Sequence, residues 1–302
     1  MFVDLHLHST ASDGILSPSR LVNKAKAKGL KAIAITDHDS ISGIKEALEE
    51  GKKLNLEVIP GIELDVGDSP QEDIIEIDIL GYFIDISNKS LISIIKKMNE
   101  SKWKQKKETI KILQKYGIKI TEAEVLKEAK GGLVGRPHIA RVALRNNPDK
   151  FKDYDSVFKQ FLIYGQPAHT DRDFELTMKE AIELIHKAKG LAFLAHPIAY
   201  IKVKNLHNLV KKFKEAGGDG IEVIYCYRKN KPYIGVPIDK QNELIEIANQ
   251  LAEEFNLLKS GGSDFHDPKT DIIGEVKVPL EMLEKIKRKV YSSSSSPSSK
   301  SS

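Results

Sequence analysis

The sequence predicts an α/β fold, a closed barrel of parallel strands into which an all-helical domain is inserted. Short apolar runs alternate with amphipathic runs on both sides of residues 91–164, whereas only helix-like periodicity remains within that stretch. About seven strands separated by helices are typical of a β/α barrel. The carboxyl ends of such strands share one rim, where barrels of this kind build their active sites.

The barrel elements are expected to alternate as strand and helix. Before the insertion, they are predicted at residues 2–8, 19–28, 31–36, 41–54, 56–66 and 74–83. After it, they are predicted at residues 177–189, 191–195, 206–216, 221–225, 241–256 and 258–260. Gly29, Gly190 and Gly217 each follow a periodic run, as is typical of helix carboxyl ends.

The inserted segment, residues 91–164, is expected to form a helical lid, which leaves residues 1–90 and 165–291 to the barrel. Its helices are predicted at residues 91–116, 121–130, 137–146 and 156–164. The first is rich in lysine and could line a groove for a phosphate backbone. Lysines scattered around a long helix more often form a solvated face, so this nucleic-acid contact is the less favoured interpretation.

The last residues, 292–302, are serine except for Pro297 and Lys300. Such a segment cannot bury enough apolar surface to offset the entropy of ordering it. A disordered serine-rich tail is therefore expected.

The composition is that of an ordinary globular protein. The 302 residues are 40% hydrophobic, and a formal charge of +4 tolerates a polyanionic substrate without demanding one. The single cysteine, Cys226, excludes intramolecular disulfides, and it follows an apolar run in which a buried, inert thiol is expected. Neither a signal peptide nor a membrane-spanning run is predicted, so we expect a cytoplasmic enzyme that does not bind membranes.

The first strand carries the pattern Asp4-Leu5-His6-Leu7-His8. Because side chains alternate along a strand, His6 and His8 project from the same face, and their imidazoles can converge on a divalent metal. Further candidate ligands are Asp13, His38, Glu63, His196, Asp264 and His266. Most of these follow predicted strands and would meet at one rim of the barrel. The sequence therefore predicts a metallohydrolase.

Other polar residues near these positions are given different roles. His169, His186 and His207 are interpreted as bystanders, although His169 could face the site because the chain is expected to re-enter the barrel there. Asp4 and Asp37 are expected to lie behind the ligands and to accept hydrogen bonds from their imidazoles.

These residues stand in motifs that resemble the PHP (polymerase and histidinol phosphatase) family. The motifs are Asp4-Leu5-His6-Leu7-His8-Ser9, Ser12-Asp13-Gly14, Ile35-Thr36-Asp37-His38-Asp39, Gly61-Ile62-Glu63, Ala195-His196-Pro197 and Ser263-Asp264-Phe265-His266. In the insertion, Gly135-Arg136-Pro137-His138-Ile139-Ala140 is similar to one branch of that family. That branch includes the 3′,5′-nucleoside bisphosphate phosphatases and a 5′-to-3′ exoribonuclease.

The resemblance implies a distorted seven-stranded β/α barrel with two or three divalent metal ions, most often manganese, with magnesium, iron(II) or zinc as alternatives. It also implies the ligands of each ion. They are His6, His8, Glu63 and Asp264 for the first, Asp13, His38 and His266 for the second, and Glu63, His196 and Asp78 for the third.

Two positions depart from the family's pattern. Asp78 stands where proteins of this branch usually have histidine, and its carboxylate favours harder ions such as manganese or magnesium over zinc. Gln166 stands where relatives commonly have lysine, so it would hold a phosphate more weakly.

The chemistry that such a site implies is phosphoester hydrolysis. A metal-bound hydroxide attacks phosphorus in line, and the metal ions neutralise the charge that develops. Arg136 is expected to hold a second phosphate, His138 to assist or to contact the same group, and Ser9 to contact the substrate. Alternatively, Arg136 and His138 only begin a helix at Pro137.

The expected substrates are the 3′-phosphate of nucleoside 3′,5′-bisphosphates, the 5′ ends of short RNA, or both. Neither stable binding of duplex DNA nor an obligate protein partner is expected. Two alternatives remain open. One is a histidinol-phosphate-type phosphomonoesterase, against which the motif around Arg136 argues; the other is a non-catalytic metal-binding PHP module, against which the nearly intact ligand set argues.

Overall fold

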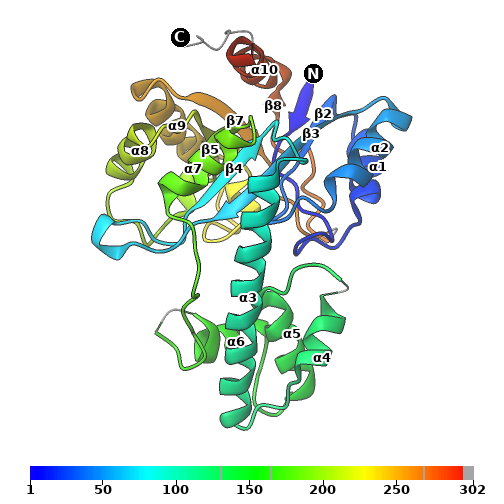
Figure 1. Cartoon of the computed structure of the whole chain (residues 1–302), viewed down its shortest axis with the longest axis vertical. Helices are drawn as coiled ribbons and strands as arrows, with labels where there is room; N and C mark the ends of the chain where they lie inside the picture. The colour runs from blue at the N-terminus through cyan, green and yellow to red at the C-terminus, as the bar shows by residue number, and fades with distance from the viewer. Residues whose placement is uncertain (130, 164, 268, 295–302) are drawn as a thin grey trace, which may run out of the picture.

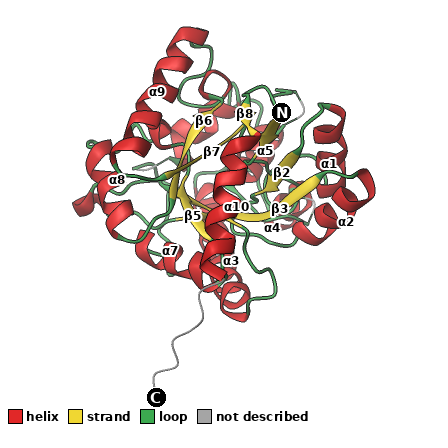
Figure 2. Ribbon diagram, turned by 90° about the horizontal axis from the view of Figure 1, so that it is seen from above, coloured by secondary structure: helices red, strands yellow, loops and turns green. Residues whose placement is uncertain are grey.

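The computed structural model describes residues 1–129, 131–163, 165–267 and 269–294. It consists of a barrel of strands surrounded by helices and a smaller helical lobe, which the long helix α3 joins to the barrel (Figure 1). Seen from above, the strands lie at the centre and the helices around them (Figure 2). The sheet has eight strands in the order β7-β6-β5-β4-β3-β2-β1-β8.

The strands are short and mostly buried. They are β1 (Phe2–Asp4), β2 (Ala32–Ile35), β3 (Glu57–Asp65), β4 (Asp78–Tyr82), β5 (Leu191–Leu194), β6 (Gly220–Tyr225), β7 (Leu258–Gly262) and β8 (Val278–Pro279). Parallel pairing joins β1 to β2, β2 to β3, β5 to β6 and β6 to β7. Every residue of β2 and β5 is buried, as is typical of strands that are covered on both faces.

The barrel closes where β1 and the residues that follow it meet β7 and the residues that follow it. The Leu5 amide donates to Gly261 O (3.1 Å), the Asp264 amide donates to His6 O (2.9 Å), and Leu7 forms a parallel bridge with Phe265. A Cβ atom at Gly262 would lie 2.4 Å from His6 N, so only glycine fits where the two segments approach. The predicted barrel is confirmed.

Two strands differ from the all-parallel, seven-stranded prediction. The eighth strand, β8, is antiparallel to β1. β4 is antiparallel to both of its neighbours, β3 and β5. The connection from β3 to β4 holds only the short 3₁₀ turn η1 (Pro70–Glu72) and no crossover helix, whereas parallel neighbours need a long crossover. This reversal places Asp78, the first residue of β4, at the rim where the other strands end.

Six helices of the described chain pack around the barrel. They are α1 (Pro18–Ala27), α2 (Ile44–Leu54), α7 (Met178–Lys187), α8 (Leu206–Glu215), α9 (Ile238–Glu254) and α10 (Leu280–Ser294), with short 3₁₀ turns η3 (Pro197–Ala199) and η4 (Tyr227–Lys229). Their sequences explain their starts: Ser17 accepts a hydrogen bond from the Arg20 amide at α1, and Thr177 and Glu180 form a capping box at α7. Helix α10 covers the end of the barrel opposite the helical lobe (Figure 1).

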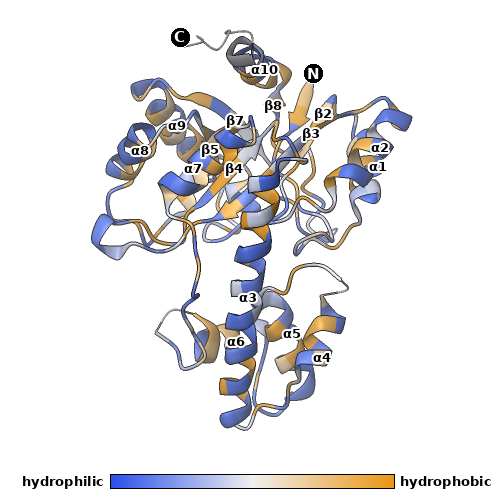
Figure 3. Ribbon diagram, viewed as in Figure 1, coloured by the Kyte–Doolittle hydropathy of each residue, from blue (hydrophilic) through white to orange (hydrophobic). Residues whose placement is uncertain are grey.

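The lobe has its own hydrophobic core. It contains the end of α3 (Lys89–Lys115), α4 (Glu122–Glu128), α5 (Arg136–Asn146), α6 (Tyr154–Val157) and the π-helical turn η2 (Phe158–Leu162). Near its start, α3 packs Leu91 and Met98 into the barrel core, and near its end it packs Ile110 and Leu113 into the core of the lobe. Hydrophilic residues predominate between these two ends (Figure 3). Helix α3 is therefore shared by both cores.

Three predicted segment boundaries fall outside the described residues or within a helix. The predicted helix ends at residues 130 and 164 lie outside the described residues. Helix α10 continues to Ser294, so the predicted start of the tail at residue 292 falls within a helix, and residues 295–302 also lie outside the described residues. None of the helices described here is both long enough and apolar enough to cross a membrane.

Candidate metal centre

His6 and His8 lie on the backbone that continues β1, and both side chains are fully buried. Their Nε2 atoms are 3.0 Å apart, as the alternation along a strand predicts. Glu63 Oε2 lies 3.2 Å from His6 Nε2 and 3.1 Å from His8 Nε2, and Asp264 Oδ1 lies 3.2 Å from His8 Nε2. These four residues offer ligand atoms that all lie within 4.8 Å of one another. The structure thus brings together the first predicted set.

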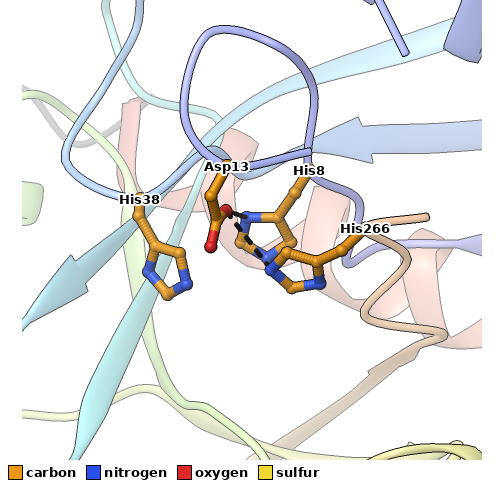
Figure 4. Close-up of side chains that lie close together, drawn as sticks. All are labelled: His8, Asp13, His38 and His266. Atoms are coloured by element: carbon orange, nitrogen blue, oxygen red, sulfur yellow. Dashed lines mark ion pairs between the residues drawn. The ribbon is translucent and has the colours of Figure 1, made fainter. Parts of the chain in front are cut away.

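A second group surrounds Asp13, which lies in the loop after β1 (Figure 4). Asp13 Oδ1 is 3.4 Å from His266 Nε2 and 3.9 Å from His8 Nδ1. His38 completes the group, in which the ligand atoms again lie within 4.8 Å of one another. The second predicted set is therefore assembled, with His8 as a member that the prediction did not include.

The third predicted set is arranged around the other oxygen of Glu63. His196 Nε2 is 3.2 Å from Glu63 Oε1 and 4.0 Å from Asp78 Oδ2. His38 also offers a ligand atom to a group with Glu63 and Asp78. Glu63 therefore lies between neighbouring groups, a position from which its carboxylate could serve two ions.

Two of these residues have a backbone conformation that side chains rarely adopt. The φ angle is 22° at His196 and 55° at Asp264. Both backbones are held in place, because the His196 amide donates to Glu222 Oε2 (2.8 Å) and the Asp264 amide donates to His6 O. Backbone strain of this kind clusters at functional sites, where the surrounding structure over-determines it.

Negative charge dominates the electrostatics of the cluster. Burial lowers the pKa of the His6 imidazole, but the carboxylates of Glu63 and Glu222 raise that pKa well above its ordinary value. At His266, burial is likewise outweighed by Asp13 and Asp264, and the pKa is raised to about 9. The carboxylates therefore favour positive charge here, as protons on the imidazoles or as bound cations.

The donor atoms also fit divalent metal ions. Within the described residues, the buried Nδ1 atoms of His8 and His196 have no hydrogen-bond partner. An unpartnered polar atom in a protein interior is costly, and a metal ion would satisfy these imidazole nitrogens. Imidazole and carboxylate donors together suit divalent transition-metal ions, which include manganese.

Glu222 and Tyr225 on β6 are site residues that the sequence interpretation missed. Glu222 is fully buried, and both of its oxygens accept from His6 Nδ1, at 3.1 and 3.2 Å. The Tyr225 hydroxyl donates to Asp264 Oδ2 (2.7 Å). Both residues orient proposed ligands from behind. The sequence did hold a signal for Glu222, since it is a glutamate within an apolar strand. A charged side chain is buried in such a strand only where it has a partner.

The predicted contacts of Asp4, Asp37 and Ser9 are corrected by the structure. The Asp4 carboxylate accepts from the backbone amides of Ser263 (2.8 Å) and Gly274 (2.9 Å), not from an imidazole ring, and burial raises its pKa to about 6. Asp37 accepts from both the amide and the hydroxyl of Ser9, each at 2.7 Å. Ser9 is fully buried, so its hydroxyl supports the loop instead of contacting a substrate.

A group of ion pairs that the sequence interpretation also missed links α3 to the cluster. Asp65 Oδ1 is 3.2 Å from His38 Nδ1, and the other oxygen of Asp65 pairs with Lys102 and with Arg172 (3.3 Å). Lys102 also pairs with Asp39. Lys102 lies 63 residues from Asp39, so no local sequence pattern could predict these pairs.

A cavity of about 620 Å³ opens between this rim and the helical lobe. Asp13, His38 and Asp78 line it on the barrel side, and Arg136, the first residue of α5, lines it on the lobe side. His138 is only 4% exposed, and its Nδ1 accepts from the Gly135 amide (2.9 Å). This nitrogen caps the helix, and His138 is not among the described residues that line the cavity, so its contact with the substrate stays a prediction.

Of the three remaining histidines, one lies at the cavity and two lie away from the metal-ligand groups. His169 lines the cavity, as the sequence left open. His186 Nε2 bonds Asp219 Oδ2 (2.7 Å), and His207 Nε2 bonds Glu254 Oε1 (2.7 Å). Neither His186 nor His207 belongs to the metal-ligand groups of the described residues.

Known proteins resemble this chain over most of its length. It is 34% identical over 266 residues to a 5′-3′ exoribonuclease of Haemophilus influenzae, covering 88% of this chain and 90% of the relative. It is 27% identical over 268 residues to a 3′,5′-nucleoside bisphosphate phosphatase of Chromobacterium violaceum, covering 88% of this chain and 87% of the relative.

Solved structures agree with the fold. An amidohydrolase from Chromobacterium violaceum superposes with a TM-score of 0.80 at 26% identity, covering 95% of this chain and 96% of that protein. The family model described as the PHP domain matches residues 4–166, a span that holds most of the clustered ligands. The chain therefore belongs to the PHP domain family.

Proposed function

We propose that this metal-dependent phosphoesterase removes the 3′-phosphate from nucleoside 3′,5′-bisphosphates. The observation that carries the proposal is the cavity, which has a cluster of metal-binding side chains on one wall and the guanidinium of Arg136 on the other. Its volume of about 620 Å³ falls in the range of small-molecule sites. The Chromobacterium violaceum relative, named for this activity, supports the choice of substrate.

The proposed reaction is a hydrolysis without a covalent enzyme intermediate. A water oxygen forms a bond to phosphorus, the bond from phosphorus to the 3′ oxygen breaks, and the leaving oxygen takes up a proton. The products are a nucleoside 5′-monophosphate and inorganic phosphate. Divalent ions bound at the cluster would activate the water and neutralise charge on the phosphoryl oxygens.

Nine residues at the rim are proposed as metal ligands. They are His6, His8, Asp13, His38, Glu63, Asp78, His196, Asp264 and His266. Four of the nine are carboxylates, which favour hard ions, so we propose manganese as the preferred metal. Glu222 and Tyr225 would orient His6 and Asp264 without binding metal themselves.

Arg136 is proposed to bind the phosphate that is not hydrolysed. Arg136 Nη1 donates a hydrogen bond to Leu162 O (3.4 Å), and a guanidinium has five N–H donors, so most of them remain for a ligand. A guanidinium can hold a phosphate through two parallel hydrogen bonds. The helical segment 91–164 is proposed as the domain that carries this group over the barrel.

Hydrolysis at the 5′ ends of short RNA is a second candidate. The exoribonuclease of Haemophilus influenzae has a higher identity to this chain, 34%, than the bisphosphate phosphatase has. A 5′-phosphorylated RNA would present the same two kinds of group, a phosphoester at the metal cluster and another phosphate near Arg136.

A substrate panel tests these assignments. Phosphate release or RNA shortening is measured with manganese on adenosine 3′,5′-bisphosphate, 5′-phosphorylated RNA dinucleotides and histidinol phosphate. The proposal expects the highest kcat/KM on the bisphosphate. A higher kcat/KM on RNA would favour the second candidate, and preference for histidinol phosphate would overturn both.

A further inference from the structure

One face of α3 lines the cavity. Lys102, Gln105, Lys106 and Thr109 all belong to its wall, and their spacing of three and four residues places them on the same side of the helix. Two further basic residues, Arg136 and Arg172, approach the same cavity from other segments. Four lysine and arginine side chains therefore line the same cavity.

Two of these four cations are already neutralised by the protein. Lys102 pairs with both Asp39 and Asp65. Arg172 pairs with Asp65 (3.3 Å) and with Glu175 (3.2 Å). These ion pairs join α3 and the segment after the lobe to the barrel. Lys102 and Arg172 therefore need no ligand to balance their charges.

Lys106 and Arg136 are different, because neither has a carboxylate within ion-pair distance in the described part of the chain. Lys106 is only 7% exposed, and its Nζ donates to the neutral Gln105 Oε1 (2.8 Å). A buried charge without a counter-charge is costly. Burial, followed by the positive charges of Arg136 and Arg172, holds the pKa of Lys106 well below its ordinary value. An anion between Lys106 and Arg136 would remove this cost.

We propose that Lys106 acts together with Arg136 to bind the second phosphate of the substrate, and that this pair selects substrates with two phosphoryl groups. The proposal rests on the proposed function and extends it, because it names the residue that makes the site specific. The ammonium supplies a point charge and the guanidinium a planar fork of donors, which together can surround one phosphate group. Lys106 is thus a specificity residue that touches the substrate away from the reacting atoms.

The test compares Lys106→Met with Lys111→Met in the metal-loaded enzyme. Methionine keeps the length of the side chain and removes its charge. Lys111 is on the same helix but its side chain is 61% exposed and outside the cavity wall, so Lys111→Met is the matched control. Thermal unfolding of each variant checks that the fold is intact.

For Lys106→Met, kcat/KM on adenosine 3′,5′-bisphosphate should fall roughly 10- to 150-fold, the usual loss for a charged hydrogen bond. The value for p-nitrophenyl phosphate, which has no second phosphate, should remain within about twofold. Lys111→Met should leave both values unchanged. Equal losses of Lys106→Met on both substrates, or no loss on either, would overturn the proposal.

The source of the second phosphate is decided by a parallel arm with 5′-phosphorylated RNA dinucleotides. A loss on RNA as large as that on the bisphosphate means that both substrates use the same pair. A loss confined to the bisphosphate assigns the pair to that substrate, whereas a loss confined to RNA would overturn the proposal.

A binding measurement separates this proposal from the proposed function. Calorimetry compares adenosine 5′-monophosphate with adenosine, and the wild-type protein should prefer the monophosphate, whereas Lys106→Met should lose most of that preference. If the wild type failed to hydrolyse the bisphosphate but still showed this difference, the proposed function would be wrong and the anion site would stand. An unchanged preference in Lys106→Met would overturn the anion site alone.

Discussion

At the scale of single residues, Glu63 shows how one side chain can organise a site. Its two oxygens contact His6 and His8 on one side and His196 on the other. The pKa of Glu63 lies well below its ordinary value, because the imidazoles of His6 and His38 outweigh the effect of burial. A carboxylate in this position remains charged and can serve two neighbouring cations.

Asp13 and His38 provide a direct test of which ligands share an ion. They come from different loops, yet the structure places both in one group with His8 and His266. We expect Asp13→Ala and His38→Ala each to lose the same single equivalent of metal, measured by elemental analysis of the purified protein. If metal-specific signals showed that the two variants lose different equivalents, the assignment of the group would be wrong.

Arg136 tests the substrate class. Loss of a bidentate charged donor to phosphate costs about 2 to 4 kcal/mol, so Arg136→Ala should reduce kcat/KM on adenosine 3′,5′-bisphosphate by roughly 30- to 1000-fold. An aryl phosphate does not reach the second phosphate position, so its kcat/KM should barely change. Equal losses on both would instead place Arg136 in the catalytic machinery or in folding.

At the scale of elements, the loops after the strands carry the ligands, and contacts between elements hold those loops in place. Asp37, after β2, accepts hydrogen bonds from Ser9 and Ser12 in the loop after β1. Residues between β1 and α1 are thereby fixed against the next strand. Asp13 owes its position to this loop, although nothing in the spacing of Asp13 from His8 would predict it.

Helix α7 offers a pH-dependent contact that is independent of the metal cluster. A hydrogen bond to Asp219 raises the pKa of His186 above its ordinary value. A raised histidine pKa means that the contribution to stability is complete below the unfolded pKa of about 6.5 and is lost as the pH rises through the folded value. The difference in Tm between wild type and His186→Gln should therefore be larger at pH 5.5 than at pH 9.

The control for this measurement is Lys189→Gln, at the end of the same segment, because lysines in general keep their charge over this range. A His186→Gln difference that is constant with pH, or that grows as the pH rises, would contradict the assigned role of the His186–Asp219 contact.

At the scale of the whole molecule, barrel closure brings together residues from both ends of the chain. Asp4 accepts from the amides of Ser263 and Gly274, and His8 lies beside Asp264. The cluster therefore exists only when the segments that follow β1 and β7 lie side by side. This dependence couples metal binding to the folding of the barrel.

The purified protein should contain more than one equivalent of divalent metal. Chelation should abolish phosphoester hydrolysis, added manganese should restore it, and removal of the metal should also lower the Tm, because ions that bind only the folded chain stabilise it. Full activity and an unchanged Tm in a protein that contains no metal would refute the metal-dependent mechanism.

Much of this protein could be predicted from its sequence by itself. The alternation of His6 and His8, the apolar runs of the strands and the helix caps are local patterns, and local patterns follow from backbone geometry and burial. They were sufficient to predict the barrel, the helical segment and the residues at the rim. The resemblance of the motifs to one family supplied a division of those residues among three ions, which stays a prediction.

Only the tertiary structure decided the contacts between distant segments. It reversed β4, because a short connection cannot return a strand to the parallel direction. It paired Glu222 with His6 and Lys102 with Asp65, and it left Lys106 buried without a counter-charge. These features depend on which side chains meet across the closed barrel and the lobe. A pattern of residues along the chain does not contain that information, because each contact joins segments that become neighbours only when the chain folds.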